Sequence, residues 1–299
     1  MRLFGLMALG LLAACATAEA PVAGDAQAPV KSLGEILEQS PAGDWRTVDQ
    51  NNLLYMQLPQ GRVIIELAAD YTPLHTANIQ ALARAHYWDG AAIVRSQENY
   101  VVQWGRDEGD PRPMGAGTPT LAAEFDRPRG GVQITRLPDP DSYAREVGFA
   151  NGFPVASNGR ETWMAHCHGM VGAGRGDTAD SGSGAELYVV IGHAPRHLDR
   201  NIATVGRVLQ GMELLSTMPR GTGALGFYET PAERTTITSV RLGSELPASE
   251  RMNLEALRTD SATFRDVIDS RRFRRESWFL DPVGHINLCN VPLPVRVRS

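Results

Sequence analysis

Residues 61–103 constrain the fold more than any other part of this chain. Residues 63–67 form a short β-branched run with a single charge, which is typical of a strand packed in a sheet. Thr72 and Pro73 then provide a helix N-cap and a proline at the first helical position, where its missing N–H is not needed. Apolar residues follow at helical spacing until an Asp-Gly turn at residues 89–90. This order predicts a strand, a helix and a second strand.

Arg95 is an unexpected residue in the second of these strands, which is otherwise rich in valine and tyrosine from position 93 to position 103. An arginine that packs against a core loses its hydration, so its guanidinium must reach a partner or a ligand. A tyrosine and a glutamine follow it at positions 100 and 103. Arg95 is therefore the first candidate for a functional residue.

Three blocks of sequence occur in an order that is known from one protein family. The first is residues 61–103, with a strand, a Thr-Pro helix, a Tyr-x-Asp-Gly turn and an arginine followed by an aromatic residue and a glutamine. The second is GSGAELYVV at residues 182–190, and the third is a Leu-Asp pair and VGRVLQGM within residues 198–212. Together they resemble the cyclophilin-type peptidyl-prolyl cis-trans isomerases over most of residues 44–242.

This resemblance implies a mainly β fold, a closed eight-stranded antiparallel barrel that is capped by two helices. The cyclophilin-like domain is expected to span residues 44–243, with residues 45–58 in its first hairpin and residues 235–242 closing the barrel. Residues 126–168 do not match the family pattern and are interpreted as a long insertion.

The final part, residues 244–299, is expected to be a C-terminal extension that packs on this domain. Apolar residues at roughly helical spacing predict one or two helices within residues 250–270. Four arginines between positions 271 and 275 form a basic cluster. A cluster of this kind is typical of a solvated face, and contact with anionic lipid is the alternative.

The resemblance also implies a site that needs neither a metal nor another cofactor. Arg95 and Gln103 are the predicted catalytic residues: Arg95 supplies a cation to the amide that rotates, and Gln103 holds Arg95 or the substrate backbone. An apolar pocket is expected to bind the proline ring. The predicted substrate-binding residues are Tyr100, Val101, Gly174, Arg175, Glu186, Tyr188, His197 and Leu198.

The chain departs from the family pattern within this site. Glu186 replaces a glutamine, Tyr188 replaces a phenylalanine, and Trp104 replaces a glycine. The Glu186 carboxylate is expected to pair with Arg95 or Arg175 and so to compete with substrate.

Two functions therefore stay open. The first is a peptidyl-prolyl isomerase that assists the folding of exported proteins. The second is a cyclophilin-like lipoprotein that binds peptides or a partner with weak or no catalysis. A purely structural role ranks behind both.

The first residues have the pattern of an export signal. Arg2 precedes a short apolar core and a small-residue end, too short to span a bilayer comfortably. The sequence LAAC ending at Cys15 resembles a bacterial lipobox and predicts a lipid on that cysteine, while ordinary cleavage after Ala20 is the alternative. Residues 1–20 are interpreted as signal peptide and residues 21–43 as a tether with a short helix. The expected location is the periplasm, with a lipid anchor in the outer rather than the inner membrane.

Composition and cysteine count narrow the class of protein. Hydrophobic residues make up 42% and charged residues 21%, so a sizeable core can be buried. A net charge of −5 gives no electrostatic reason to bind nucleic acid. If Cys15 carries lipid, Cys167 and Cys289 remain as a pair in an oxidising compartment, and a disulfide is the hypothesis. Because no oligomer interface is marked in the sequence, we hypothesise a monomer.

His166 and His168 flank Cys167 and suggest zinc. On a strand the two histidines would share one face while the cysteine points to the other. That leaves two converging ligands, whereas a zinc site needs three or four. We therefore predict no metal site, and a strand with a structural cysteine instead.

Overall fold

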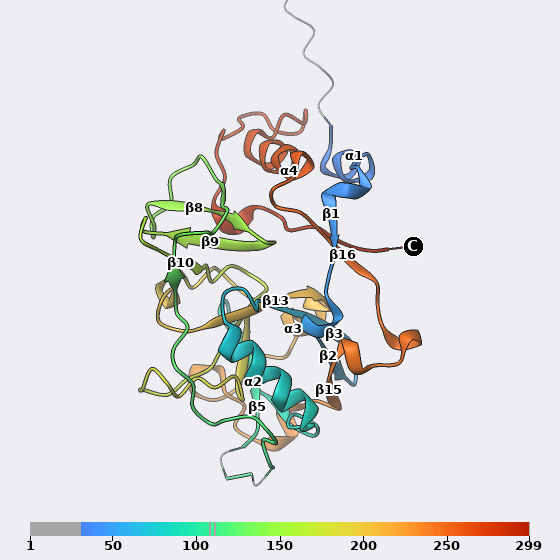
Figure 1. Cartoon of the computed structure of the whole chain (residues 1–299), viewed down its shortest axis with the longest axis vertical. Helices are drawn as coiled ribbons and strands as arrows, with labels where there is room; N and C mark the ends of the chain where they lie inside the picture. Colours follow the sequence, from blue (N-terminus) through green and yellow to red (C-terminus); the bar gives the residue numbers. More distant parts are fainter. Residues whose placement is uncertain (1–30, 108, 111, 299) are drawn as a thin grey trace, which may run out of the picture. The chain divides into compact units, whose positions relative to one another are not determined.

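Nine antiparallel strands form the largest sheet of the computed structural model, which describes residues 31–107, 109–110 and 112–298 (Figure 1). Their order across the sheet is β14-β4-β5-β12-β11-β13-β3-β2-β15. The strands are β2 (Leu53–Leu58), β3 (Gly61–Leu67), β4 (Ala92–Ser96), β5 (Val101–Gly105), β11 (Met170–Ala173), β12 (Leu187–Val190), β13 (Thr204–Gln210), β14 (Thr235–Thr236) and β15 (Ser239–Leu242). The predicted strand–helix–strand order of residues 61–103 is confirmed.

The two edge strands of this sheet, β14 and β15, are consecutive in the chain. Between them, the Ile237 N–H donates to the carbonyl of Ala91 at 2.7 Å, beside one edge of the sheet. The next residue, Thr238, donates its N–H to the carbonyl of Gln57 at 2.8 Å, beside the other edge. The sheet is therefore curled, so that one segment contacts both of its edges.

The helix α2 (Pro73–Arg84) packs its buried side chains into the main core of this sheet, and the short helix α3 (Met212–Ser216) adds to the same core. Proline occupies the first turn of α2 as predicted, but the Thr72 side chain makes no capping hydrogen bond. The Glu124 carboxylate accepts the N–H groups of Leu74 and His75 instead, at 3.0 and 2.9 Å. A carboxylate is favourable at a helix N-terminus, so a distant loop caps α2.

The insertion forms a sheet of its own. Its five antiparallel strands are β6 (Arg127–Pro128), β7 (Thr135–Arg136), β8 (Glu146–Ala150), β9 (Phe153–Ser157) and β10 (Glu161–Met164). Phe149 of β8 packs edge-on against Phe264 of α4 (Ala262–Phe273), with ring centroids 5.0 Å apart. These residues belong to a second apolar core that the insertion shares with the C-terminal extension.

A third sheet joins the start of the domain to the extension. It contains β1 (Trp45–Thr47), β16 (Leu254–Leu257) and β17 (Val295–Val297), with β16 in the middle. The predicted first hairpin is wrong in part, because β1 pairs with β16 and only β2 pairs with β3. The helices predicted for residues 250–270 are also wrong in part. Leu254–Leu257 is a buried strand, and a short apolar run does not distinguish a strand from a helix.

A disulfide ties the insertion to the extension. The Sγ atoms of Cys167 and Cys289 are 2.06 Å apart, and Cys289 lies in the short helical turn Leu288–Asn290. The prediction of a strand around Cys167 is wrong, because β10 ends at Met164 and residues 165–169 connect it to β11.

The helix α1 (Leu33–Glu38) begins with a capping box between Ser32 and Glu35 and packs against α4 (Figure 1). In the part of the chain that the structure describes, we find no helix with the length and apolar character needed to cross a membrane. The predicted signal peptide and the lipid site at Cys15 lie outside the described residues.

Candidate active site

Arg95 lies on β4 next to an irregularity in the pairing with β5, which places it directly opposite Gln103. Its guanidinium makes three hydrogen bonds to protein oxygens. Nε donates to the carbonyl of Leu225 at 2.7 Å, Nη1 donates to Oε1 of Gln103 at 3.1 Å, and Nη2 donates to Oε1 of Gln97. The side chain is half-buried and is held from three directions.

Two aromatic rings flank the same guanidinium. The Arg95 Cζ lies 5.6 Å from the ring centroid of Tyr100 and 5.1 Å from that of Phe227. Burial lowers the pKa of Arg95 below its ordinary value, while Tyr100 and Glu186 act in the opposite direction. An arginine remains charged in proteins, so the site presents a fixed cation.

Gln103 connects this cation to Glu186. Its Oε1 accepts from Arg95, and its Nε2 donates to Oε1 of Glu186 at 2.7 Å. The expected ion pair of Glu186 with Arg95 or Arg175 is absent from the described residues. The Gln103 amide lies between Glu186 and Arg95, and Arg175 donates to the carbonyls of Asn201 and Gly176. The carboxylate orients the amide and does not occupy the arginine.

A cavity of about 110 Å³ opens beside this group. It is lined by Arg95, Tyr100, Val101, Gln103, Gly174, Arg175, Tyr188, Leu198 and Ile202. Every predicted site residue is in this set except Glu186 and His197. Glu186 lies behind Gln103, and the His197 ring stacks on Tyr100 with centroids 6.1 Å apart. The structure therefore brings the whole predicted site together.

The alternation of side chains along β5 explains why this cavity is separate from the core. Val102 and Trp104 belong to the main core, whereas Val101 packs with Tyr188 in a small apolar cluster at the cavity. Successive residues of a strand point to opposite faces of the sheet. Trp104, one of the departures from the family pattern, therefore faces away from the cavity.

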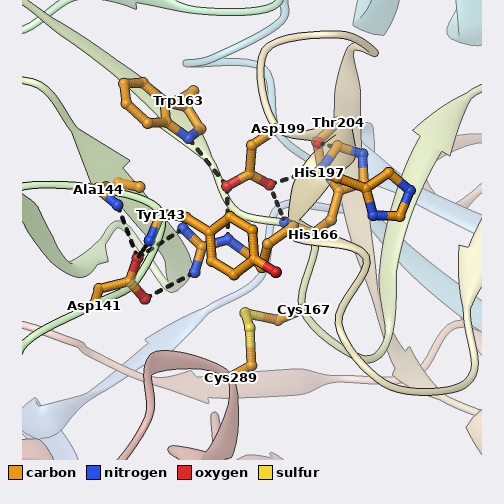
Figure 2. Close-up of polar contacts among 12 residues, drawn as sticks. Asp141, Tyr143, Ala144, Trp163, His166, Cys167, His197, Asp199, Thr204 and Cys289 are labelled. Carbon is orange, nitrogen blue, oxygen red and sulfur yellow. Dashed lines mark hydrogen bonds and ion pairs between the residues drawn. A yellow bond between two sulfur atoms is a disulfide. The ribbon is translucent and has the colours of Figure 1, made fainter.

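The hydroxyl of Tyr188 enters a buried network that starts at His166. Figure 2 shows His166 and Asp199 of this network side by side. The phenolic oxygen lies 2.8 Å from Nε2 of His166, and Nδ1 of His166 lies 3.1 Å from Oδ1 of Asp199. The carboxylate of Asp199 can only accept a hydrogen bond, so Nδ1 of His166 donates to it, and Nε2 pairs with the hydroxyl of Tyr188. Burial raises the pKa of Tyr188 well above its ordinary value, and the charges of Tyr100 and Asp199 add to this. The added hydroxyl is thus hydrogen-bonded within the protein.

The same network reaches the insertion. Oδ2 of Asp199 accepts from Nε of Arg196 at 2.6 Å and from Nε1 of Trp163 at 3.2 Å. The two terminal nitrogens of Arg196 donate to the carboxylate of Asp141 at 3.0 and 3.3 Å. Burial opposes ionisation of Asp199, but the His166 hydrogen bond and the Arg196 charge outweigh it, so the pKa of Asp199 lies below its ordinary value. The cavity wall and the insertion are therefore coupled by charge and hydrogen bonds.

Sequence reasoning missed this role of His166, which it considered only as a zinc ligand. Both ring nitrogens of His166 have protein partners, Cys167 is in the disulfide, and His168 is exposed. Within the described ranges there is no group of three or more histidine, cysteine, aspartate or glutamate residues arranged to hold a metal ion. The histidine is part of the support behind the cavity.

Comparison with known proteins identifies the family. Residues 53–242 match the sequence model of the cyclophilin type peptidyl-prolyl cis-trans isomerase/CLD family. The chain belongs to this family. As a cyclophilin, it has the peptidyl-prolyl cis-trans isomerase activity by which the family is defined, and its fold is the mainly β cyclophilin fold. The family predicted from the three sequence blocks is confirmed.

Individual relatives agree with this assignment. A probable peptidyl-prolyl cis-trans isomerase of Brucella suis biovar 1 is 24% identical over 177 residues, which cover 59% of this chain and 76% of the relative. A Brucella abortus protein of the same name is 23% identical over 177 residues, with the same coverage. The crystal structure of cyclophilin AquaCyp293 from Hirschia baltica matches with a TM-score of 0.65 and 25% identity. That match covers 85% of this cyclophilin and 94% of the other chain, so it extends beyond residues 53–242.

Proposed function

We propose that the cavity beside Arg95 is the place where this cyclophilin isomerises the peptide bond before proline in exported proteins. The observation that carries the proposal is the fixed guanidinium of Arg95 at the edge of a small cavity that has Val101, Leu198 and Ile202 on its wall. The reaction requires no nucleophile and no proton transfer. It requires only that the twisted amide binds better than either planar isomer.

Rotation of this amide is slow because resonance gives its C–N bond double-bond character, with a barrier of about 18–20 kcal/mol. At the transition state the resonance is lost and the proline nitrogen regains its lone pair. A hydrogen-bond donor aimed at that nitrogen therefore stabilises the transition state more than the ground state.

Arg95 retains donors for this task. A guanidinium has five N–H groups. The described contacts use one each on Nε, Nη1 and Nη2, so one N–H on each terminal nitrogen is left for the substrate. The flanking rings of Tyr100 and Phe227 and the Gln103 amide fix the guanidinium before substrate arrives, which avoids reorganisation during the reaction.

The remaining cavity residues have supporting roles in this proposal. Val101, Tyr188 and Leu198 provide the apolar wall for the proline ring. Gln103, oriented by Glu186, holds Arg95 and offers a contact to the substrate backbone. Gly174, Arg175 and the Tyr100–His197 stack bind the peptide around the proline.

We also interpret the large sheet as the closed eight-stranded barrel of the family. If β14 and β15 count as one strand, the sheet has eight, and its two edges meet on that strand. The hydrogen bonds of Ile237 and Thr238 to opposite edges support this interpretation.

The proposed location is the periplasm, with a lipid on Cys15 that anchors a monomer to the membrane. The Cys167–Cys289 disulfide supports this location, because structural disulfides persist in oxidising compartments. The expected clients are unfolded exported proteins that contain proline. Radiolabelled lipid incorporation in the wild type and its loss in Cys15→Ser test the anchor.

A paired measurement of catalysis and binding tests the proposed activity. Isomerisation of X-Pro peptides is followed in a protease-coupled assay, and affinity for the same peptides by calorimetry. We expect Arg95→Ala to reduce kcat/KM by about 10²–10³, the effect of losing one preorganised donor, with a smaller change in affinity. Arg84→Ala, on the exposed face of α2, is the matched control and should leave both unchanged. Peptide binding without acceleration by the wild type would refute catalysis and leave a peptide-binding module.

A further inference from the structure

The segment that follows α4 carries an unusual concentration of exposed apolar side chains. Trp278 is 80% exposed, Leu280 is 97% exposed and Val283 is 73% exposed. Single exposed apolar residues are common on protein surfaces, but clusters of them mark interaction sites. Here three large side chains lie within six consecutive residues, and Phe279 beside them is half-buried.

The basic cluster, residues 271–275, spans the end of α4 and the start of this segment. Arg272 pairs with Asp139, and Arg271 pairs with Glu276. Arg274 and Arg275 form no ion pair in the described part of the chain, although the charge of Arg274 helps to lower the pKa of Glu276. Their guanidinium groups lie over the rings of Phe279 and Phe273, at 5.2 and 5.0 Å.

A cavity of about 310 Å³ lies beside these side chains. Arg271, Arg272 and Arg274 line it together with His285 and one carboxylate, Asp281. Cationic groups and apolar side chains therefore share one surface, which contains a hollow large enough for a small anionic group.

We propose that residues 274–283 dock on an anionic membrane surface. Trp278, Leu280 and Val283 enter the boundary between headgroups and acyl chains, and Arg274 and Arg275 contact lipid phosphates. Tryptophan is suited to this boundary because its ring is largely apolar while its N–H stays hydrated. Arginine places its apolar stem along the same boundary and its charge among the headgroups. Each basic group near an anionic membrane adds attraction that a zwitterionic membrane does not provide.

The path of the chain favours a membrane over a protein partner. The first described helix, α1, packs against α4, which leads directly into residues 274–283 (Figure 1). Only 15 residues lie between Cys15 and Lys31, just before α1, and a chain of that length reaches at most about 58 Å when fully extended. An acylated Cys15 would therefore keep this surface close to the bilayer, which raises its effective concentration. Only this proximity rests on the proposed anchor; the surface itself is independent of it.

Quenching of tryptophan fluorescence by brominated lipids tests the proposal. Of the five tryptophans in the chain, Trp45, Trp88, Trp104 and Trp163 are buried, so quenching reports on Trp278. The full chain with Cys15→Ser is mixed with vesicles of brominated phosphatidylcholine, with or without an equal part of phosphatidylglycerol. We expect strong quenching only with phosphatidylglycerol, and almost none in Trp278→Phe. Residues 1–15 contain no tryptophan, so they give no signal of their own.

Charge variants complete the test. Arg274→Gln with Arg275→Gln should weaken vesicle binding about 25-fold, about fivefold for each arginine. Arg145→Gln with Arg160→Gln removes the same charge from exposed positions of the insertion and should have little effect.

Three results would overturn the proposal. The first is no quenching in either the Cys15→Ser chain or the acylated wild type, and the second is equal quenching on zwitterionic and anionic vesicles. The third is that the surface binds unfolded protein and does not bind vesicles. Acylated protein that stays on vesicles without quenching would refute the proposed docking surface and would leave the proposed lipid anchor standing. X-Pro isomerisation, measured in parallel, should be the same in all these variants. A failure of the proposed isomerase activity is therefore distinguishable from a failure of the membrane proposal.

Discussion

The hydrogen bond between Tyr188 and His166 gives the sharpest prediction about how the insertion supports the active site. Both side chains are buried, with 4% and 1% exposed, and His166 also binds Asp199. The change His166→Leu removes both hydrogen bonds and leaves the Tyr188 hydroxyl without its partner. Each buried polar group left unpaired costs about 1–3 kcal/mol, so we expect a loss of about 3 kcal/mol in the free energy of unfolding.

Tyr188→Phe should have a smaller effect on stability, about 1 kcal/mol, because it removes one hydrogen bond and keeps the ring. The two changes act on the same contact. The double variant should therefore lose about 1–2 kcal/mol less than the sum of the single variants. His168→Leu changes an exposed neighbour and is the matched control, with little expected effect.

Urea unfolding of the wild type and the four variants measures these energies, provided that the slope of free energy against urea stays constant. Isomerisation of an X-Pro peptide supplies the functional readout. Tyr188→Phe keeps the ring in the cavity wall and should keep kcat/KM within about threefold, whereas His166→Leu should raise KM more than it lowers kcat. Additive effects on stability, or equal activity of the His166→Leu variant and the wild type, would refute the reasoning.

Three further predictions concern stability. Cys167→Ser with Cys289→Ser opens a loop of 122 residues and should reduce the free energy of unfolding by about 4–5 kcal/mol in the chain-entropy model. Urea unfolding measures this loss, and an unchanged midpoint would contradict the prediction. Arg272 lowers the pKa of Asp139, and His166 and Arg196 lower the pKa of Asp199, in both cases against the effect of burial. Groups with depressed pKa values stabilise the fold above their unfolded pKa, so stability should fall as the pH drops below about 4. Substituting Asn at both positions should make this loss of stability smaller. Acid titration followed by circular dichroism measures it. Glu124→Ala removes the cap of α2 and should cost about 1 kcal/mol, while Glu124→Gln should cost less; equal thermal midpoints of wild type and Glu124→Ala would disprove the capping role.

The sequence was most informative where the signal is local. Arg95 could be singled out because a charge in a buried strand needs a partner, and the three family blocks placed most cavity residues around it. The period of two along β5 also explains which residues face the cavity.

Other parts of the site depend on contacts between distant segments. Leu225 and Phe227, which hold the Arg95 guanidinium, come about 130 residues after it in the chain and carry no local signal of that role. His166 resembled a metal ligand because sequence spacing does not show that Tyr188 and Asp199 lie against its two nitrogens. Such pairings follow from the fold and from the position of the insertion within it.

The fold shows the same limit. The short run Leu254–Leu257 has spacing that suits a helix, but pairing with β1 and β17 on both sides makes it a buried strand. The Thr72 and Pro73 signal located the start of α2 correctly, yet the capping carboxylate comes from Glu124 in a later loop. Local pattern gave the elements, and long-range packing decided their partners.

The central claim is that Arg95 accelerates rotation of the X-Pro bond. The most direct test is the cis–trans exchange rate of an X-Pro peptide at equilibrium, measured by NMR with catalytic amounts of the full chain. Uncatalysed exchange takes about 10–100 s, so added wild-type protein should give exchange well above this rate, and Arg95→Ala should return it nearly to background. Background exchange with the folded wild type, or full activity of Arg95→Ala, would contradict the account.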